Sequence, residues 1–108
     1  MSNNAISITD AKSRKEWDLF VTSHQEANFL QSWDFYEFHA SRGKKIVRRI
    51  ATDKSGKIIG AYAGVIETAK RGRHLAIAGG PILDWAKKSL VTKIFSDMKE
   101  QGIANHCV

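Results

Sequence analysis

The order of apolar patterns along this 108-residue chain predicts an α/β (α+β) fold, with a mixed, mainly antiparallel sheet and helices on both of its faces. Three observations carry the prediction. Two helix-like segments with apolar residues at spacings of three and four precede a block of strand-like segments. The longest of these, Lys57 to Thr68, is almost continuously apolar or small, which is typical of a strand covered on both faces. A third helical pattern lies near the C-terminus.

The N-terminal part predicts a short edge strand over Ala5 to Ile8 and then a helix. Ser13 and Glu16 have the Ser-x-x-Glu spacing at which each side chain satisfies a free backbone amide of the other residue, so the helix is expected to begin there. The apolar side chains after this cap repeat at helical spacing up to about His24 and therefore share one face: Trp17, Phe20 and Val21.

A second helix, rich in aromatic residues, is expected to begin after Ser32, which can cap it, and to stop at Gly43. The spacing places three side chains on one face and two aromatic ones beside them: Trp33, Tyr36 and Ala40, with Phe35 and Phe38. On physical grounds alone, these aromatic rings are core residues.

Two strands joined by a turn are expected next. The stretch from Lys45 to Asp53 alternates in polarity as a half-buried strand does, and Asp53 to Gly56 is a turn. With Lys57 to Thr68 these residues form an antiparallel hairpin. The alternation leaves two choices for the pair that points inward, either Ile46 with Ile50 or Val47 with Ala51. It also places Arg48 and Arg49 on opposite faces of the strand.

The C-terminal part is expected to contain a strand, a helix and the start of another strand. A basic loop from Ala69 to Arg73 leads to a strand over His74 to Ala78. Asp84 is expected to cap the helix, which stops at Gly102. The last residues, Ile103 to Val108, are expected to begin a fifth strand, so the domain would be truncated after that strand.

The composition is that of a basic globular domain. The chain has a net charge of +6 and a pI near 9.7, which favours partners that carry phosphates or carboxylates. The longest weakly polar run, Ile58 to Ile66, is too short to cross a bilayer, and the N-terminus lacks a secretory signal pattern. The lone cysteine, Cys107, agrees with a reducing compartment. We therefore expect a cytoplasmic protein with, at most, a peripheral membrane contact.

No motif for a cofactor or a metal is complete. Gly79 and Gly80 lie between a strand and a helix, where a pyrophosphate-binding loop would stand. However, Ala76 occupies the place of the Gln or Arg of such a loop, and Pro81 has no amide to donate. The four histidines lack the spacing of metal ligands. We predict no cofactor and no metal, and we assign no catalytic residue.

Three ordered segments carry a resemblance to one family. The first is Phe29-Leu-Gln31-Ser32-Trp33, followed by Gly43, and the second is Asp53-Lys-Ser-Gly56-Lys-Ile-Ile-Gly60-Ala61. The third is Ile77-Ala-Gly-Gly80-Pro81-Ile-Leu-Asp84. In this order, over roughly Glu16 to Val108, they resemble the N-terminal acetyltransferase-like (GNAT-like) domain of the Fem-type aminoacyltransferases.

The resemblance implies a bacterial protein of peptidoglycan synthesis. Fem-type enzymes have two tandem GNAT-like domains, and they move an amino acid from aminoacyl-tRNA to the peptide of a lipid-linked or nucleotide-linked muropeptide, without acetyl-CoA. The groups that act on the aminoacyl ester are expected in the second domain, so residues 1–108 would be one incomplete domain, inactive alone. At His39 many members have a Lys that meets the precursor phosphates. The residues implied for precursor binding are Gln31, Trp33, His39 and Arg42.

Two other classes of function stay open on the sequence. An acetyl-CoA-dependent N-acetyltransferase of the same fold would use the glycine pair before Pro81 as its pyrophosphate loop. A small non-catalytic basic module would bind RNA or DNA through exposed aromatic rings, whereas the aromatic residues here are expected on core-facing helix stripes. We therefore expect aminoacyl-tRNA and a muropeptide as partners, and no DNA.

Overall fold

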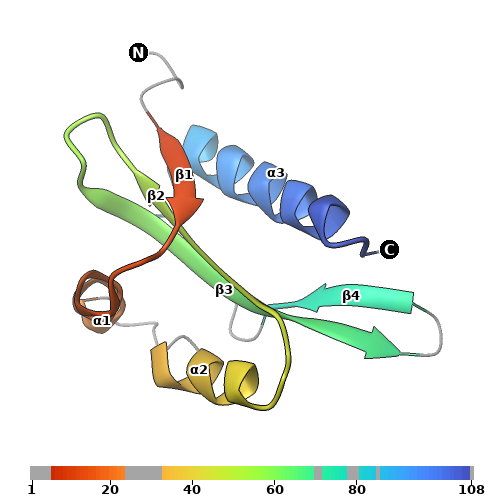
Figure 1. The fold of residues 1–108 in the computed structure, drawn as a ribbon. Helices are drawn as coiled ribbons and strands as arrows, with labels where there is room; N and C mark the ends of the chain where they lie inside the picture. Colours follow the sequence, from red (N-terminus) through yellow and green to blue (C-terminus); the bar gives the residue numbers. More distant parts are fainter. Residues whose placement is uncertain (1–5, 24–32, 70–71, 78–80, 85, 108) are drawn as a thin grey trace.

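The computed structural model describes residues 6–23, 33–69, 72–77, 81–84 and 86–107. Within this part, five strands form one sheet with helices on both faces, which confirms the predicted fold class (Figure 1). All pairings between these strands are antiparallel. In chain order the elements are β1 (Ser7–Asp10), α1 (Arg14–Thr22), α2 (Trp33–Ser41), β2 (Ile46–Thr52), β3 (Ile58–Ala69), β4 (Gly72–Ala76), β5 (Ile82–Leu83) and α3 (Lys88–Ala104).

The long strand β3 is the centre of the sheet. β2 pairs with one side of β3 and β1 with the far side of β2. The other side of β3 holds two short strands, with β4 beside residues 65–69 and β5 beside Gly60 and Ala61. The predicted hairpin is confirmed, and β5 is a strand that the sequence pattern does not predict. Between β4 and β5, the carbonyl oxygen of Ala63 accepts a hydrogen bond of 3.0 Å from the buried hydroxyl of Tyr36.

Two apolar layers cover the sheet, one on each face. Helices α1 and α2 cover one face, and α3 lies across the other (Figure 1). The first layer contains Trp17, Val21, Tyr36, Ala61, Ala63, Val65 and Ile82. The second contains Val47, Ala51, Tyr62, Ile66, Leu83, Leu90 and Ile94. Because successive strand residues point to opposite faces, β2 and β3 contribute to both layers.

This double coverage answers the question that the alternation of β2 left open. Ile46 and Ile50 pack on the layer of α1 and α2, while Val47 and Ala51 are buried beneath α3, so both pairs point inward. A half-buried strand was the wrong expectation for β2. The predicted division of the two arginines between the faces is confirmed. Arg48 forms an ion pair with Glu37 of α2, and Arg49 forms one with Asp97 of α3.

Close contact between β3 and α3 depends on a glycine. A Cβ atom placed on Gly60 would lie 2.7 Å from Cδ1 of Ile94 and 3.5 Å from Cδ1 of Leu90. Both of these leucine and isoleucine side chains are almost fully buried, at 1% exposure. The missing side chain at Gly60 therefore allows the helix to pack directly on the strand.

The predicted start of α1 and end of α2 are confirmed. The hydroxyl of Ser13 accepts a hydrogen bond of 3.2 Å from the amide of Glu16, as expected for a helix cap. After α2, Gly43 has a φ of 83°, a value that favours glycine and ends the helix. Ser32, the predicted cap of the second helix, lies outside the described residues. The same is true of His24, the predicted last residue of the first helix.

Two strands are displaced from their predicted ranges. β1 covers Ser7–Asp10 rather than Ala5 to Ile8, because its ladder with β2 extends to the pair of Asp10 and Arg49, whose side chains also form an ion pair. β4 begins at Gly72 rather than at His74, because Gly72 and Arg73 already pair with Ala69 and Thr68 of β3. Three residues of the predicted basic loop, Ala69, Gly72 and Arg73, therefore belong to strands.

The predicted cap of the third helix is wrong. Ile82 and Leu83 pair with β3, so Asp84 ends a strand instead of starting a helix. Its carboxylate accepts a hydrogen bond of 3.0 Å from the amide of Ala86, which makes a turn. α3 begins at Lys88. The side chain of Lys87, the residue before it, makes no hydrogen bond that caps the helix.

The predicted end of this helix at Gly102 and the strand over Ile103 to Val108 are also wrong. α3 continues to Ala104, and the left-handed residue that closes it is His106, with a φ of 59°. The amide of His106 donates to the carbonyl of Ile103 at 3.0 Å, and that of Cys107 donates to the carbonyl of Gly102 at 2.7 Å. This pair of bonds is the Schellman pattern, with His in the place that glycine usually takes.

Only one bridge remains of the predicted last strand in the described part, a parallel one between Cys107 and Arg73 of β4. None of the helices in the described ranges is long and apolar enough to cross a membrane.

Candidate functional site

The residues predicted to bind a precursor are concentrated on α2 and the turn after it. Gln31 lies outside the described residues. Trp33 is the first residue of α2, His39 lies in its last turn, and Arg42 follows it with its amide bonded to the carbonyl of His39 at 3.1 Å. The helix therefore places three of the four predicted residues, and their surroundings differ.

Trp33 is held against the sheet by Arg48 of β2. The guanidinium carbon of Arg48 lies 3.5 Å from the centroid of the Trp33 ring system, in cation–π contact. Nη2 of the same arginine donates to the carbonyl of Trp33 at 3.3 Å and to Oε2 of Glu37 at 3.1 Å. Burial lowers the pKa of Arg48, and its contacts with Glu37 oppose that shift. One face of the indole is therefore already occupied.

His39 and Arg42 lie on a different side of α2, among phenylalanine rings. The ring of His39 meets Phe35 edge-on with centroids 4.9 Å apart, and it meets Phe38 at 5.7 Å. The guanidinium carbon of Arg42 lies 5.6 Å from the centroid of the Phe38 ring, which is 56% exposed. The structure thus brings His39 and Arg42 together on an exposed aromatic surface, and it places Trp33 apart from them.

A basic cavity opens just beyond α2. It has a volume of about 350 Å³, and its wall is formed mainly by Lys44, Lys45, Ile66, Glu67, Thr68 and Arg73. Nζ of Lys44 and Oε1 of Glu67 form an ion pair at 2.6 Å. The hydrogen bond from Lys44 lowers the pKa of Glu67, and the nearby His39 and His74 lower it further. This cavity lies between the C-terminal end of α2 and the strands β3 and β4.

No single sequence motif predicts this cavity, because its basic residues come from two different hairpins. The signal was present in the hairpins. The amide of Ile66 donates to the carbonyl of Lys45 at 2.8 Å, which continues the pairing of β2 with β3. In the next pair of strands, Thr68 is opposite Arg73. Two predicted hairpins sharing β3 are sufficient to bring these basic residues to one end of the sheet.

A second polar group of residues surrounds Asp97 of α3. Its Oδ2 accepts hydrogen bonds from the hydroxyl of Tyr62 at 2.6 Å and from Nε of Arg49 at 3.0 Å, and its Oδ1 accepts from Nη2 of Arg49 at 2.9 Å. Burial, followed by the bond to Asp97, raises the pKa of Tyr62, and the bond to Asp97 raises the pKa of Arg49. At neutral pH these residues are a fixed ion pair with a neutral tyrosine, an arrangement that joins α3 to the sheet.

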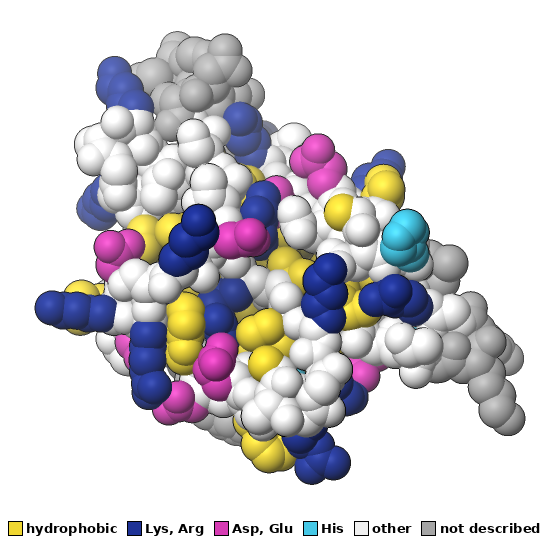
Figure 2. All heavy atoms as spheres, in the orientation of Figure 1, with side chains coloured by type: hydrophobic (Ala, Val, Ile, Leu, Met, Phe, Trp, Pro, Cys, Tyr) yellow, Lys and Arg dark blue, Asp and Glu magenta, His cyan; other side chains and the backbone are white. Residues whose placement is uncertain are grey.

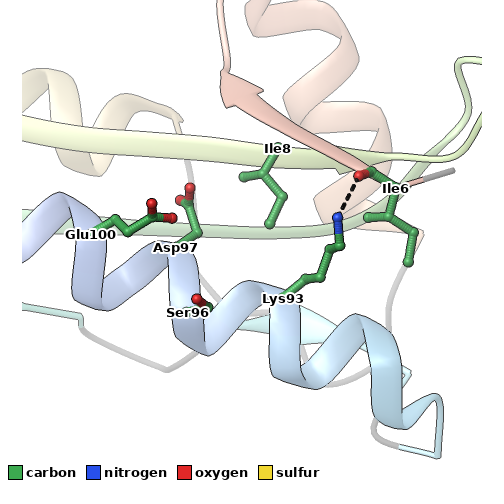
Figure 3. Close-up of a pocket in the computed structure, with 6 residues that line it drawn as sticks. All are labelled: Ile6, Ile8, Lys93, Ser96, Asp97 and Glu100. Carbon is green, nitrogen blue, oxygen red and sulfur yellow. Dashed lines mark hydrogen bonds between the residues drawn. The ribbon is translucent and has the colours of Figure 1, made fainter. Parts of the chain in front are cut away.

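A small cavity of about 270 Å³ adjoins this ion pair, between the N-terminal segment and α3 (Figure 3). Nζ of Lys93 donates to the carbonyl of Ile6 across it at 3.2 Å. The other lining residues are Ile8, Ser96, Asp97 and Glu100. Because Asp97 already has partners for both oxygens, we interpret this group as structural.

The structure offers little support for a pyrophosphate loop before α3. Gly79 and Gly80 lie outside the described residues, but β5 and the turn at Asp84 separate them from the start of α3 at Lys88. Such a loop needs the helix to begin directly after the glycines. In the described ranges, no three residues of His, Cys, Asp or Glu gather closely enough to hold a metal ion.

Basic side chains are spread over one face of the molecule (Figure 2). On the face shown in Figure 2, Lys and Arg side chains surround a central group of apolar side chains, with acidic side chains between them.

A comparison with curated proteins finds no significant match. The sequence model of the FemAB family, in contrast, matches residues 12–108, which is nearly the whole chain. The chain therefore belongs to the FemAB family, a family of transferases of peptidoglycan synthesis.

Proposed function

We propose that this chain serves an aminoacyltransferase, which moves an amino acid from aminoacyl-tRNA to the peptide of a peptidoglycan precursor and so builds an interpeptide bridge. The observation that carries the proposal is the match to the FemAB family over residues 12–108. In this proposal residues 1–108 belong to the N-terminal GNAT-like domain, and the reaction takes place in the cytoplasm, where aminoacyl-tRNA is found.

The chemistry proposed is the exchange of an ester for an amide. A free amine of the precursor peptide attacks the carbonyl carbon of the aminoacyl ester, and a carbon–nitrogen bond forms. The bond from this carbon to the ribose oxygen of the tRNA breaks, and the proton lost by the amine is taken up by that oxygen. No cofactor is consumed, since the ester already supplies an activated acyl group.

We assign the binding of the precursor to the α2 surface that contains His39 and Arg42, with further contributions from Trp33, the first residue of the helix, and from Gln31, which precedes it in the sequence. The guanidinium of Arg42 is placed over Phe38, and none of the hydrogen bonds or ion pairs among the described residues uses its donors, so they can meet a phosphate or carboxylate. The ring of His39 is held between Phe35 and Phe38.

The net charge of the chain supports two anionic substrates. Aminoacyl-tRNA and the phosphate-bearing precursor are both attracted to a chain with a net charge of +6. On the face shown in Figure 2, basic side chains are spread out rather than collected in a single patch, and this attraction accelerates encounter with either substrate.

The proposal is tested by a transfer assay with the product of the whole reading frame that encodes this chain. Charged tRNA and a nucleotide-linked or lipid-linked muropeptide are supplied together, and the extended muropeptide is measured by mass spectrometry. The expected result is addition of one amino acid that depends on the charged tRNA. Failure with all charged tRNAs and both muropeptides would refute the proposal. Titration with acetyl-CoA is the companion measurement, because micromolar binding would favour an acetyltransferase.

A further inference from the structure

The guanidinium of Arg48 is buried without a full set of partners. The side chain of Arg48 is 8% exposed, and the carboxylate that it contacts, Glu37, is 51% exposed. Its Nε is shielded from solvent and has no hydrogen-bond partner within the described part of the chain. A buried donor of this kind has lost its hydration, and nothing replaces it. Because an apolar side chain of similar volume is often as stable as such a buried charge, stability alone does not account for this arginine.

The closest contacts of Arg48 are with a single residue, Trp33. Its guanidinium carbon lies 3.5 Å from the centroid of the indole, well within the range of a cation–π contact. Its Nη2 donates to the carbonyl of Trp33 at 3.3 Å, so the same group contacts both the ring and the backbone of this residue. A planar guanidinium stacked on an aromatic face fixes the plane of the ring, which a flexible ammonium group would not do.

The position of α2 has a separate support. Arg48 is opposite Ala63 in the ladder of β2 and β3, and the carbonyl of Ala63 accepts the hydrogen bond of 3.0 Å from the buried hydroxyl of Tyr36. Trp33, Tyr36 and Glu37 are spaced by three and four residues and therefore share one side of the helix. Because Tyr36 holds the helix, loss of Arg48 would free the indole of Trp33 without moving α2.

We propose that Arg48 is a positioning residue for precursor binding, which holds the indole of Trp33 in the orientation that meets the muropeptide. This role rests on the proposed function, in which Trp33 contributes to the binding of the precursor. Trp33 is half-buried, and a cation already covers one face of its ring. The part of the indole that stays exposed therefore suits an uncharged group of the muropeptide, a sugar ring or an apolar side chain of the peptide, rather than an ammonium group.

Three substitutions separate positioning from stability and from charge. Arg48→Met removes the stacked guanidinium and keeps an unbranched apolar side chain in its place. Glu37→Gln removes the ion pair at 3.1 Å and leaves the stacking on Trp33 intact. Asp97→Asn breaks the buried ion pair with Arg49 on the other face of the sheet, so it lowers stability without touching Trp33 (Figure 1).

The experiment is fluorine NMR of the chain with fluorinated tryptophan, in which Trp33→Phe identifies the resonance of Trp33 by its absence. Spectra are recorded before and during titration with the nucleotide-linked muropeptide, and urea midpoints are measured in parallel. We expect the muropeptide to shift the Trp33 resonance of the unmodified chain. Arg48→Met should move this resonance in the free chain and leave the urea midpoint unchanged or higher. It should weaken muropeptide binding about threefold to tenfold, the penalty of ordering one large side chain on binding.

The two control variants should behave differently from Arg48→Met. Glu37→Gln and Asp97→Asn should each change the affinity for the muropeptide less than about twofold, although Asp97→Asn lowers the urea midpoint. A loss of affinity in either control that equals the loss in Arg48→Met would overturn the inference. So would a lower urea midpoint or an unfolded chain in Arg48→Met, because Arg48 would then act through stability.

The response of Trp33 and aminoacyl transfer are measured independently, so their failures are distinguishable. If transfer occurs and the Trp33 resonance does not respond to the muropeptide, the positioning role is refuted and the proposed function stands. If the resonance responds in a way that requires Arg48 and no transfer occurs, the proposed function is refuted and the positioning role stands.

Discussion

Asp97 and Asp10 hold the same arginine from two different environments, and the difference between them predicts a large difference in stability. The side chain of Asp97 is 8% exposed and that of Asp10 is 67% exposed, and both contact Arg49 at about 3 Å. Replacing either aspartate by asparagine removes one negative charge. Only at Asp97 is the charge removed from a buried pair, in which the side chain of Arg49 is 15% exposed.

The magnitude follows from what remains after the change. Loss of one partner of a buried pair costs roughly 3–5 kcal/mol. Arg49 keeps Asp10 and the carbonyl of Ile8, and asparagine keeps one oxygen for the hydroxyl of Tyr62. We therefore expect Asp97→Asn to lower the free energy of unfolding by about 2–3 kcal/mol. An exposed pair contributes about 0–1 kcal/mol, so Asp10→Asn should cost less than about 1 kcal/mol.

The assay is urea unfolding of the two variants and the unmodified chain, followed by far-ultraviolet circular dichroism at pH 7. With unchanged slopes, the midpoints give the two differences in free energy directly. In thermal unfolding, Asp97→Asn should lower Tm by about 10–20 °C for a chain of this size. Equal losses for the two variants, or a loss under about 0.5 kcal/mol for Asp97→Asn, would refute the reasoning that burial determines the contribution of this ion pair.

Three further predictions concern glycine, helix closure and alkaline pH. Gly60→Ala should lower the free energy of unfolding by about 1–3 kcal/mol in urea titration, because the new Cβ would meet Ile94 at 2.7 Å; an unchanged midpoint would contradict this close packing. His106→Gly should raise it by about 1 kcal/mol, since the φ of 59° is costly for other residues, whereas His106→Ala should give no such gain. The pKa of Tyr62 is raised by burial and by Asp97, so the folded state holds its proton when the unfolded chain releases it. Its contribution is fully present below about pH 10, and stability should fall above that pH more steeply in the unmodified chain than in Tyr62→Phe; parallel losses would contradict it.

The features of the fold that could be predicted are those fixed by short-range spacing. The cap of Ser13 on Glu16 and the stop at Gly43 need only a few neighbouring residues, and both are confirmed. The apolar run of β3 predicts its central position because burial on both faces removes the need for polar alternation.

The errors occur where a longer-range contact decides between two local choices. Asp84 is a good helix cap in isolation, but Ile82 and Leu83 before it are used in pairing with β3. Gly102 is a good helix stop in isolation, but the hydrogen bonds that close α3 are made at His106 and Cys107. Neither outcome can be read from the neighbouring sequence, because it depends on where the helix lies on the sheet.

In the candidate site, too, some residues are placed by local spacing and others by contacts with distant parts of the chain. The aromatic helix brings His39 and Arg42 to one exposed surface, as their spacing allows, whereas the position of Trp33 depends on Arg48. Arg48 lies on β2 and not on the helix that contains Trp33. The sequence pattern predicts only that Arg48 and Arg49 point to opposite faces of their strand. The basic cavity requires two hairpins to be considered together, which no single motif does.

The hydrogen bond from Tyr36 to the carbonyl of Ala63 has a mechanical consequence for α2. It fills the break in pairing between β4 and β5 on one side of β3, so a side chain of the helix performs a task that a neighbouring strand performs elsewhere. The helix cannot slide or rotate along the sheet without leaving that buried carbonyl without a donor. α2 is therefore fixed in position under His39 and Arg42, and these two residues adjust to a bound ligand by side-chain rotation rather than by movement of the helix.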